Sequence, residues 1–284
     1  MNGLLALVLF SPSLLFADLS LAGKLKVNLR VLTSEYLNGR VSGTESESSA
    51  AEFIKSQFNK AGLTAKIEPF SVQCLYKGIV KVDGKNVMAW LPSSATINSK
   101  TIVIGAHFDG VGYPAANDNA SGTALLLSLA ELAKNRKWKH DLVFAAFGAE
   151  EKGLCGSAHF VANNSTATLV FMINLDMVGQ SLKEEGGPLY VVGDDENPRL
   201  QSAFQTAQGN SKLRIIFGTQ AKLAYEWASD HKRFHDVGIP AVMLTGGNAQ
   251  DHHKETDTED KIEYEYLEAV IELLYQALAE LDKN

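Results

Sequence analysis

Four short segments of the chain hold side chains that bind metal ions, and each follows an apolar run. The runs and the residues after them are 101–104 with His107, Asp109 and Asp118, 142–147 with Glu150 and Glu151, 170–175 with Asp176, and 241–244 with His252 and His253. Apolar runs of this length are typical of buried strands, and ligands of such folds gather at the carboxyl ends of the strands. We therefore expect these side chains to lie close together and to hold a pair of divalent cations.

Two zinc ions that share one carboxylate need about five protein ligands drawn from His and Asp or Glu, with open positions for a water molecule and a substrate oxygen. The four segments supply that number and leave one glutamate over. A spare carboxylate beside a metal-bound water can take the proton as the water attacks, which is the role of a general base. The residue types therefore predict metal-assisted hydrolysis.

Each residue also has an ordinary structural interpretation. His107 would be a buried histidine that hydrogen-bonds to Asp109, and Asp118 would cap the helix that follows it. The carboxylates of residues 150–151 would form a solvated pair at the end of a strand. These independent coincidences would all have to hold together, so the metal site is the favoured interpretation.

Six strings carry these residues, in this order along the chain: GAHFDG, ANDNASG, FGAEEKGLCGS, NLDMVG, SDHKRF and HHKETDT. They resemble the motifs of the dizinc aminopeptidase family, which belongs to the clan of co-catalytic zinc exopeptidases. The resemblance runs from the region of Val41 to the C-terminus. It implies a zinc exopeptidase fold and removal of the first residue from peptides with a free N-terminus.

The resemblance also implies a role for each residue. The implied metal ligands are His107 and Asp176 for one zinc ion, Glu151 and His253 for the other, and Asp118 as the bridge between them. Glu150 would be the general base, and Asp109 would orient His107 by accepting its other ring N–H. The same family pattern implies a cis peptide bond between Asp118 and Asn119.

His252 departs from the family pattern, in which a tyrosine is frequent at this position. His253 is the expected ligand because the pattern puts the ligand four residues before an Asp-Thr pair, here residues 257–258. A tyrosine would donate a hydrogen bond to the developing oxyanion, and an imidazole can do so only through a protonated nitrogen. We predict that His252 takes this donor role. The alternative is that it points to solvent or holds its own loop.

Two further segments are placed near the substrate. The resemblance puts residues 229–231, with His231, at the rim of the substrate cleft. Residues 225–227, Tyr-Glu-Trp, precede this segment and are expected to line the specificity pocket. The side-chain preference and the natural substrate do not follow from the sequence.

The order of apolar runs and helical periods predicts an α/β fold with a mixed, largely parallel central sheet and helices on both faces. Expected helices cover 45–61, 121–134, 198–208 and 262–281, and expected strands cover 63–70, 79–91, 101–104, 142–147, 169–174 and 241–244. Asp83-Gly84 is expected to turn a hairpin between 79–82 and 86–90. Because no linker, repeat or low-complexity tract interrupts the pattern, residues 23–284 are expected to form one globular catalytic domain.

Residues 1–22 are interpreted as a secretory signal segment. The uncharged apolar stretch 4–17 is too short to span a bilayer and ends near small residues, with cleavage after Ala17 or Ala22. We therefore expect an exported protein, periplasmic or secreted, with no stable membrane span in the mature chain. No Lys or Arg precedes the stretch, and a buried N-terminal helix is the alternative.

The net charge and the two cysteines limit which binding partners and which covalent links the chain can have. The chain has 33 acidic and 26 basic residues, a formal charge of -7, and no stripe rich in Lys or Arg, which argues against a nucleic-acid partner. Cys74 and Cys155 are the two cysteines. In an exported protein they can pair, while Cys155 can instead be a packed thiol or an adventitious zinc ligand. The pairing and the oligomeric state are left open.

Three other functions share parts of this pattern. A glutaminyl cyclase of the same fold typically lacks a full two-metal set, whereas this chain retains one. Carboxypeptidase-type relatives anchor a substrate carboxylate with basic residues, which cannot be located in the sequence. A binding ectodomain with an inactive peptidase fold would have lost ligands, and none is lost.

Overall fold

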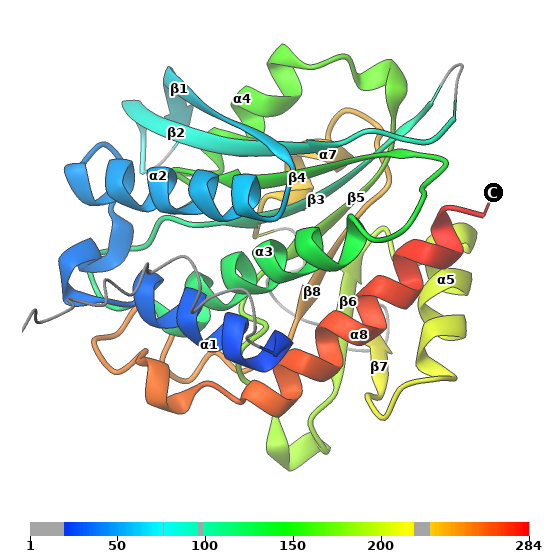
Figure 1. The fold of residues 1–284 in the computed structure, drawn as a ribbon. Coiled ribbons are helices and arrows are strands. Elements are labelled where there is room, and N and C mark those ends of the chain that lie inside the picture. The colour runs from blue at the N-terminus through cyan, green and yellow to red at the C-terminus, as the bar shows by residue number, and fades with distance from the viewer. Residues whose placement is uncertain (1–19, 76, 96–98, 219–227, 284) are drawn as a thin grey trace, which may run out of the picture.

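The computed structural model describes residues 20–283, except 76, 96–98 and 219–227 (Figure 1). The helices are α1 (Leu21–Leu32), α2 (Glu45–Lys60), α3 (Gly122–Ala133), α4 (Cys155–Asn163), α5 (Pro198–Gln208), α7 (His231–His235) and α8 (Tyr264–Leu281). The strands are β1 (Thr64–Leu75), β2 (Ile79–Leu91), β3 (Thr101–His107), β4 (Asp141–Phe147), β5 (Leu169–Leu175), β6 (Leu189–Gly193), β7 (Ile215–Phe217) and β8 (Ala241–Thr245). Short helical turns are η2 (Glu35–Arg40), η3 (Ala116–Ser121), η4 (Thr166–Thr168), η5 (Lys183–Glu185) and η6 (Glu259–Lys261).

The strands form one sheet in the order β1-β2-β4-β3-β5-β8-β6-β7. The four central strands, β4, β3, β5 and β8, are parallel to one another. The flanking pairs β1–β2, β2–β4 and β6–β8 are antiparallel, and β7 is parallel to β6. This arrangement confirms the predicted mixed, largely parallel sheet.

Helices cover both faces of the sheet, as predicted (Figure 1). On one face, α1, α2, α3, α5 and α8 bury apolar side chains in the largest hydrophobic cluster, which also takes side chains from the sheet. On the other face, Phe160 of α4 and Phe234 of α7 pack against Phe147 of β4. The central strands are therefore buried on both sides, which explains why their sequences are continuous apolar runs without alternation.

The predicted hairpin turn at Asp83-Gly84 is wrong. Both residues lie inside β2, which pairs with β1 over its whole length, and Gly84 lies opposite Phe70. A side chain at position 84 would place its Cβ 2.6 Å from the Phe70 ring, so the glycine makes room for that ring. The dipeptide has the composition of a turn, but packing against the neighbouring strand determines its conformation.

Other elements agree with the sequence to within a few residues or were not predicted. Helix α2 ends before Gly62, whose φ of +85° is the left-handed conformation expected after a helix. Strands β6 and β7, of 5 and 3 residues, were missed. Helix α1 begins at Leu21, and the rest of the predicted leader lies outside the described residues. No described helix combines the length and apolar character needed to cross a bilayer.

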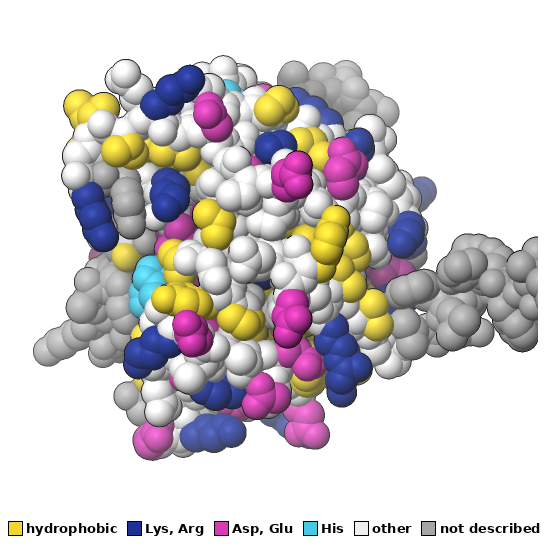
Figure 2. All heavy atoms as spheres, turned by 90° about the vertical axis from the view of Figure 1, so that its left-hand side faces the viewer, with side chains coloured by type: hydrophobic (Ala, Val, Ile, Leu, Met, Phe, Trp, Pro, Cys, Tyr) yellow, Lys and Arg dark blue, Asp and Glu magenta, His cyan; other side chains and the backbone are white. Residues whose placement is uncertain are grey.

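The loops that follow the parallel strands lie together on the left-hand side of Figure 1. Figure 2 looks on to that side and shows acidic and basic side chains interspersed over it, with hydrophobic side chains in small groups between them. This edge of the sheet is where the four predicted ligand segments must meet.

Candidate active site

The loop after β3 and the end of β5 bring His107 and Asp176 together. The His107 Nε2 atom lies 3.2 Å from Oδ1 of Asp118 and 3.5 Å from Oδ1 of Asp176. His107 is buried, because β3 carries it into the sheet edge, and only 1% of its side chain is exposed. His107 and Asp176 are the pair expected to hold the first cation together with the bridging carboxylate of Asp118.

The second expected set lies on the other side of Asp118. The His253 Nε2 atom is 3.4 Å from Oδ2 of Asp118 and 2.9 Å from Oε2 of Glu151. The two oxygens of Asp118 therefore face different histidines, as a bridging carboxylate must. Oxygen Oε1 of Glu151 is buried and accepts no hydrogen bond from any described residue. A buried carboxylate oxygen without a donor is the kind of atom that a cation satisfies.

His252 also lies at this site. Its Nε2 atom is 3.1 Å from Oδ2 of Asp118, and its ring lies against that of His253 with centroids 3.8 Å apart. His252 contacts one carboxylate, whereas His253 contacts both Asp118 and Glu151. Both imidazoles have 44% of their side chains exposed, so the site is open on this side.

The donor atoms fall into two groups whose members lie within 4.8 Å of one another: Asp118 with His252 and His253, and His107 with Glu150 and Asp176. Imidazole and carboxylate donors in this number suit zinc. The residues present are therefore of the kinds that fit zinc.

Asp109 supports this site in a different way from the one predicted. The His107 Nδ1 atom lies 3.1 Å from the main-chain carbonyl oxygen of Asp109 and 3.7 Å from its carboxylate, so the carbonyl is the hydrogen-bond acceptor. The carboxylate instead accepts the N–H groups of Glu150 at 3.0 Å and Glu151 at 3.3 Å, and the Ser42 hydroxyl at 3.0 Å. Asp109 thus joins the loop after β3 to the loop after β4.

The loop that carries Asp118 is fixed from two directions. The peptide bond between Asp118 and Asn119 is cis, as the sequence resemblance implies. Asp257 accepts the N–H groups of Asn117 at 2.8 Å and Asp118 at 3.0 Å, and the Asn119 side chain donates to the Leu175 carbonyl at 2.7 Å. The loop after β8 and the end of β5 therefore set the position of the central carboxylate.

Electrostatics set Glu150 apart. Burial raises the pKa of its carboxyl well above the ordinary value, the charge of His107 opposes this rise, and the carboxylates of Asp230 and Asp176 add to it. Burial likewise raises the pKa of Asp230 to about 7 against the influence of His107. A buried carboxyl with a raised pKa, next to a set of metal ligands, is typical of a general acid or base.

Asp230 and Ser229 were not predicted as site residues. Ser229 donates its hydroxyl to Oδ2 of Asp176 and accepts the Asn174 amide at 2.8 Å, so it holds Asp176 from behind. His231 is fully buried rather than exposed at a rim. The SDHKRF string contains both Ser229 and Asp230 and is the sequence signal for them. The predicted specificity residues 225–227 lie outside the described residues.

Residues 86–278 of the chain match the family described as Peptidase family M28. The chain belongs to peptidase family M28. This match covers the four ligand segments and confirms the resemblance seen in the motifs.

Curated relatives of this M28 chain include an aminopeptidase and a leupeptin-inactivating enzyme. Aminopeptidase YwaD of Bacillus subtilis (strain 168) is 33% identical over 193 residues, which cover 64% of this chain and 41% of that protein. Leupeptin-inactivating enzyme 1 of Streptomyces exfoliatus is 30% identical over 241 residues, covering 81% of this chain and 50% of that protein. The M28 chain thus spans half or less of the length of these curated relatives.

Solved structures share its fold. BSAP, a zinc aminopeptidase from Bacillus subtilis, matches with a TM-score of 0.79 at 19% identity, over 91% of this chain and 94% of that one. Glutaminyl cyclase from Porphyromonas gingivalis matches with a TM-score of 0.74 at 19% identity, over 93% of this chain and 99% of that one. The fold is therefore common to both activities, and the site residues must separate them.

The two cysteines of the M28 chain form a disulfide. Cys74 lies in β1 and Cys155 begins α4, and their Cα atoms are 6.0 Å apart. The bridge joins the outer hairpin to the segment that directly follows Glu151. Cys155 is consequently neither a packed thiol nor an additional zinc ligand.

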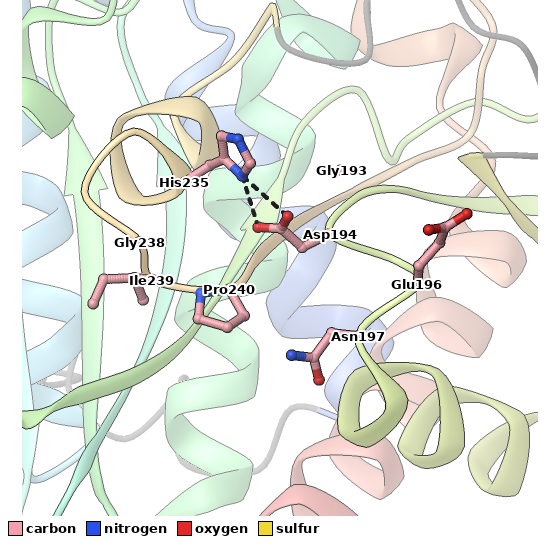
Figure 3. Close-up of a pocket in the computed structure, with 8 residues that line it drawn as sticks. All are labelled: Gly193, Asp194, Glu196, Asn197, His235, Gly238, Ile239 and Pro240. Atoms are coloured by element: carbon pink, nitrogen blue, oxygen red, sulfur yellow. Dashed lines mark hydrogen bonds and ion pairs between the residues drawn. The ribbon is translucent and has the colours of Figure 1, made fainter.

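A cavity of about 580 Å³ lies elsewhere, beside the carboxyl end of β6 (Figure 3). It is lined by Gly193, Asp194, Glu196, Asn197, His235, Gly238, Ile239 and Pro240. Because β6 is antiparallel to β8, with Gly193 opposite Val242, this cavity lies next to the amino-terminal end of β8. It is therefore at the edge of the sheet opposite the metal ligands.

Proposed function

We propose that this M28 protein is an aminopeptidase that uses two zinc ions and Glu150 as general base. The observation that carries the proposal is the pair of donor sets on either side of Asp118, with a further carboxylate, Glu150, buried beside His107 and Asp176. His107 and Asp176 would hold one zinc ion, and Glu151 and His253 the other. The relative named as an aminopeptidase supports this reading.

When bound, the zinc ions would lower the pKa of a water molecule and polarise the scissile carbonyl. Glu150 would accept the proton from that water and pass it to the leaving amine. Its burial at the end of β4 keeps the carboxyl out of bulk solvent, and Asp109 fixes its main chain. His252, half exposed at the open side, would donate a hydrogen bond to the developing oxyanion.

The charge of the site favours a substrate with a free amino group. The buried or nearly buried carboxylates around it are Asp109, Asp118, Glu150, Glu151, Asp176, Asp230 and Asp257. A cluster of carboxylates attracts the α-ammonium group of a peptide, which would limit the enzyme to removing one residue at a time.

The rival activities fit less well. The glutaminyl cyclase of Porphyromonas gingivalis shares the fold, but this chain keeps donors on both sides of Asp118. A carboxypeptidase needs a cation that can meet the substrate carboxylate. Arg40, the buried guanidinium nearest these loops, gives its N–H groups to main-chain carbonyls and is shielded from the substrate.

We also propose that the protein is exported, to the periplasm or the medium. The apolar leader and the Cys74–Cys155 disulfide support this location, because disulfides persist in oxidising compartments. Cleavage after Ala17 would keep Ser20, whose side chain accepts the Gly23 N–H and caps α1. Cleavage after Ala22 would remove that cap.

The decisive experiment compares leucine p-nitroanilide with its acetylated form, before and after chelation. We expect cleavage of the free amine only, loss of that cleavage with chelator, and recovery with zinc. Equal rates on the two substrates would point to an endopeptidase or amidohydrolase. Activity that survives full zinc removal would contradict the metal mechanism.

A further inference from the structure

Arg40 is a fully buried arginine at the end of η2, between α1 and α2. Its Nε donates to the carbonyl of Phe108 at 2.6 Å, and its two terminal nitrogens donate to the carbonyls of Leu32, Pro114 at 3.1 Å and Ala115 at 2.9 Å. All of these acceptors are main-chain groups. Among the described residues no carboxylate forms an ion pair with Arg40. A guanidinium buried in this way stabilises the main chain through hydrogen bonds rather than pairing with a single acidic side chain.

Three of the four carbonyls bound by Arg40, those of Phe108, Pro114 and Ala115, belong to the loop that connects two expected metal ligands, and the fourth, Leu32, ends α1. Phe108 directly follows His107, and residues 114–115 directly precede η3, which contains Asp118. One planar side chain therefore ties together the start and the end of the segment between these ligands. Its fork of donors matches several fixed acceptors at once, which a flexible ammonium group cannot do equally well.

The main chain around Arg40 is packed tightly against the same loop. Gly39 has a φ of +69°, and a Cβ there would lie 2.4 Å from the Tyr113 carbonyl oxygen. A Cβ at Gly110 would lie 2.8 Å from the Gly39 carbonyl oxygen. Asn38 and Arg40 also have positive φ, a conformation that persists only where surrounding contacts enforce it. The η2 segment and the loop are thus fitted to each other.

Arg40 also brings a positive charge to an acidic region. Burial lowers the pKa of Arg40 to about 10, while the charges of Asp109, Asp257 and Asp118 oppose this fall, so the guanidinium stays protonated at neutral pH. Before any metal binds, the carboxylates repel one another, and a fixed cation reduces that repulsion. The charge acts without occupying a carboxylate oxygen that a zinc ion needs.

We propose that Arg40 is a positioning residue of the metal site, which holds His107 and Asp118 at the spacing that two zinc ions require. The inference rests on the proposed function, because it takes the zinc ions as the ligand. It adds a residue outside the ligand motifs, in a segment some 70 residues earlier in the chain than His107.

The test measures zinc affinity by competition with a chromophoric chelator for the wild type, Arg40→Lys, Arg40→Met and Arg30→Met. Arg30 is the matched control, since it lies in the neighbouring α1 with 60% of its side chain exposed and pairs with Glu259 at 3.4 Å. Lysine keeps the charge and loses the fork, and methionine loses both. We expect about tenfold weaker binding for Arg40→Lys and about a hundredfold for Arg40→Met, the range for residues that orient metal ligands.

Circular dichroism of the metal-free proteins separates folding from positioning. Folded Arg40 variants with wild-type zinc affinity would overturn the inference and leave Arg40 a merely structural residue. If Arg40→Met does not fold, Arg40→Lys decides alone by the same criterion. A wild-type protein that binds no zinc would instead contradict the proposed function, and that result is distinct because the variants play no part in it.

Discussion

The two edges of the sheet both carry histidines and carboxylates, but the surroundings of these side chains differ. Beside the cavity of Figure 3, Asp194 accepts the Ala241 N–H at 2.9 Å and lies 3.0 Å from Nδ1 of His235, whose side chain is 44% exposed. At the opposite edge, the carboxylates of Glu150, Glu151 and Asp230 are buried and have raised pKa values. The first group is partly exposed and lies beside the cavity, whereas the second is a cluster of carboxyls whose pKa values are raised by burial and by their mutual repulsion. Buried carboxyls with raised pKa values, rather than a large cavity, therefore mark the chemical site.

The largest expected effect comes from Glu150→Gln. The amide cannot accept the proton, so kcat should fall about 10²–10⁴-fold, while zinc content stays at the wild-type value. Measurements of kcat on leucine p-nitroanilide and of bound zinc test this together. Asp194→Asn, at the opposite edge, is the matched control and should leave kcat unchanged. Normal turnover in zinc-loaded Glu150→Gln would remove the assignment of Glu150.

His252→Ala should have the next largest effect. If its imidazole donates to the oxyanion, kcat falls about 10²–10³-fold with zinc content unchanged, the usual result of deleting one such donor. His235→Ala, which removes the exposed imidazole beside Asp194, is the control. An unchanged kcat would show that His252 only points to solvent or holds its loop. Lost zinc would identify His252, instead of His253, as the ligand.

Asp230 is expected to affect stability rather than rate. In the metal-free protein its pKa is raised from 3.8 to about 7, so the folded state binds the proton more tightly than the unfolded state. The free energy of unfolding should therefore fall as pH rises from about 4 to 7, by up to about 4 kcal/mol from this group. Urea unfolding of Asp230→Asn should show a flatter pH dependence and higher stability at pH 8. Identical pH profiles for variant and wild type would contradict this account.

The sequence predicted the central part of the molecule well because two signals agree there. Strands β3, β4, β5 and β8 are largely apolar runs, and each ends at or is followed by side chains that can bind a metal, such as His107 and Asp176. In a parallel sheet the carboxyl ends of the strands lie at the same edge, so the sequence alone predicts that these side chains meet. The cis bond at Asp118 followed from the family resemblance alone.

The features that the sequence did not predict depend on contacts between residues that are far apart in the chain. Asp83-Gly84 is a dipeptide typical of turns. Only the packing of Gly84 against the Phe70 ring on the neighbouring strand explains why it lies in a strand. Strand β7 has 3 residues, too few for any period to be recognised. Arg40 looks like an ordinary surface arginine in the sequence, and its burial depends on carbonyls that lie about 70 residues away.

The disulfide between Cys74 and Cys155 closes a covalent ring across a separation of 81 residues. That ring contains His107, Asp109, Asp118, Glu150 and Glu151. A protease that cuts the chain once anywhere within it leaves both pieces attached to each other. In surroundings where other proteases are present, a nick in the connection between β2 and β3 would therefore release no fragment until the disulfide is reduced, and a gel without reductant would show one band where a gel with reductant shows two.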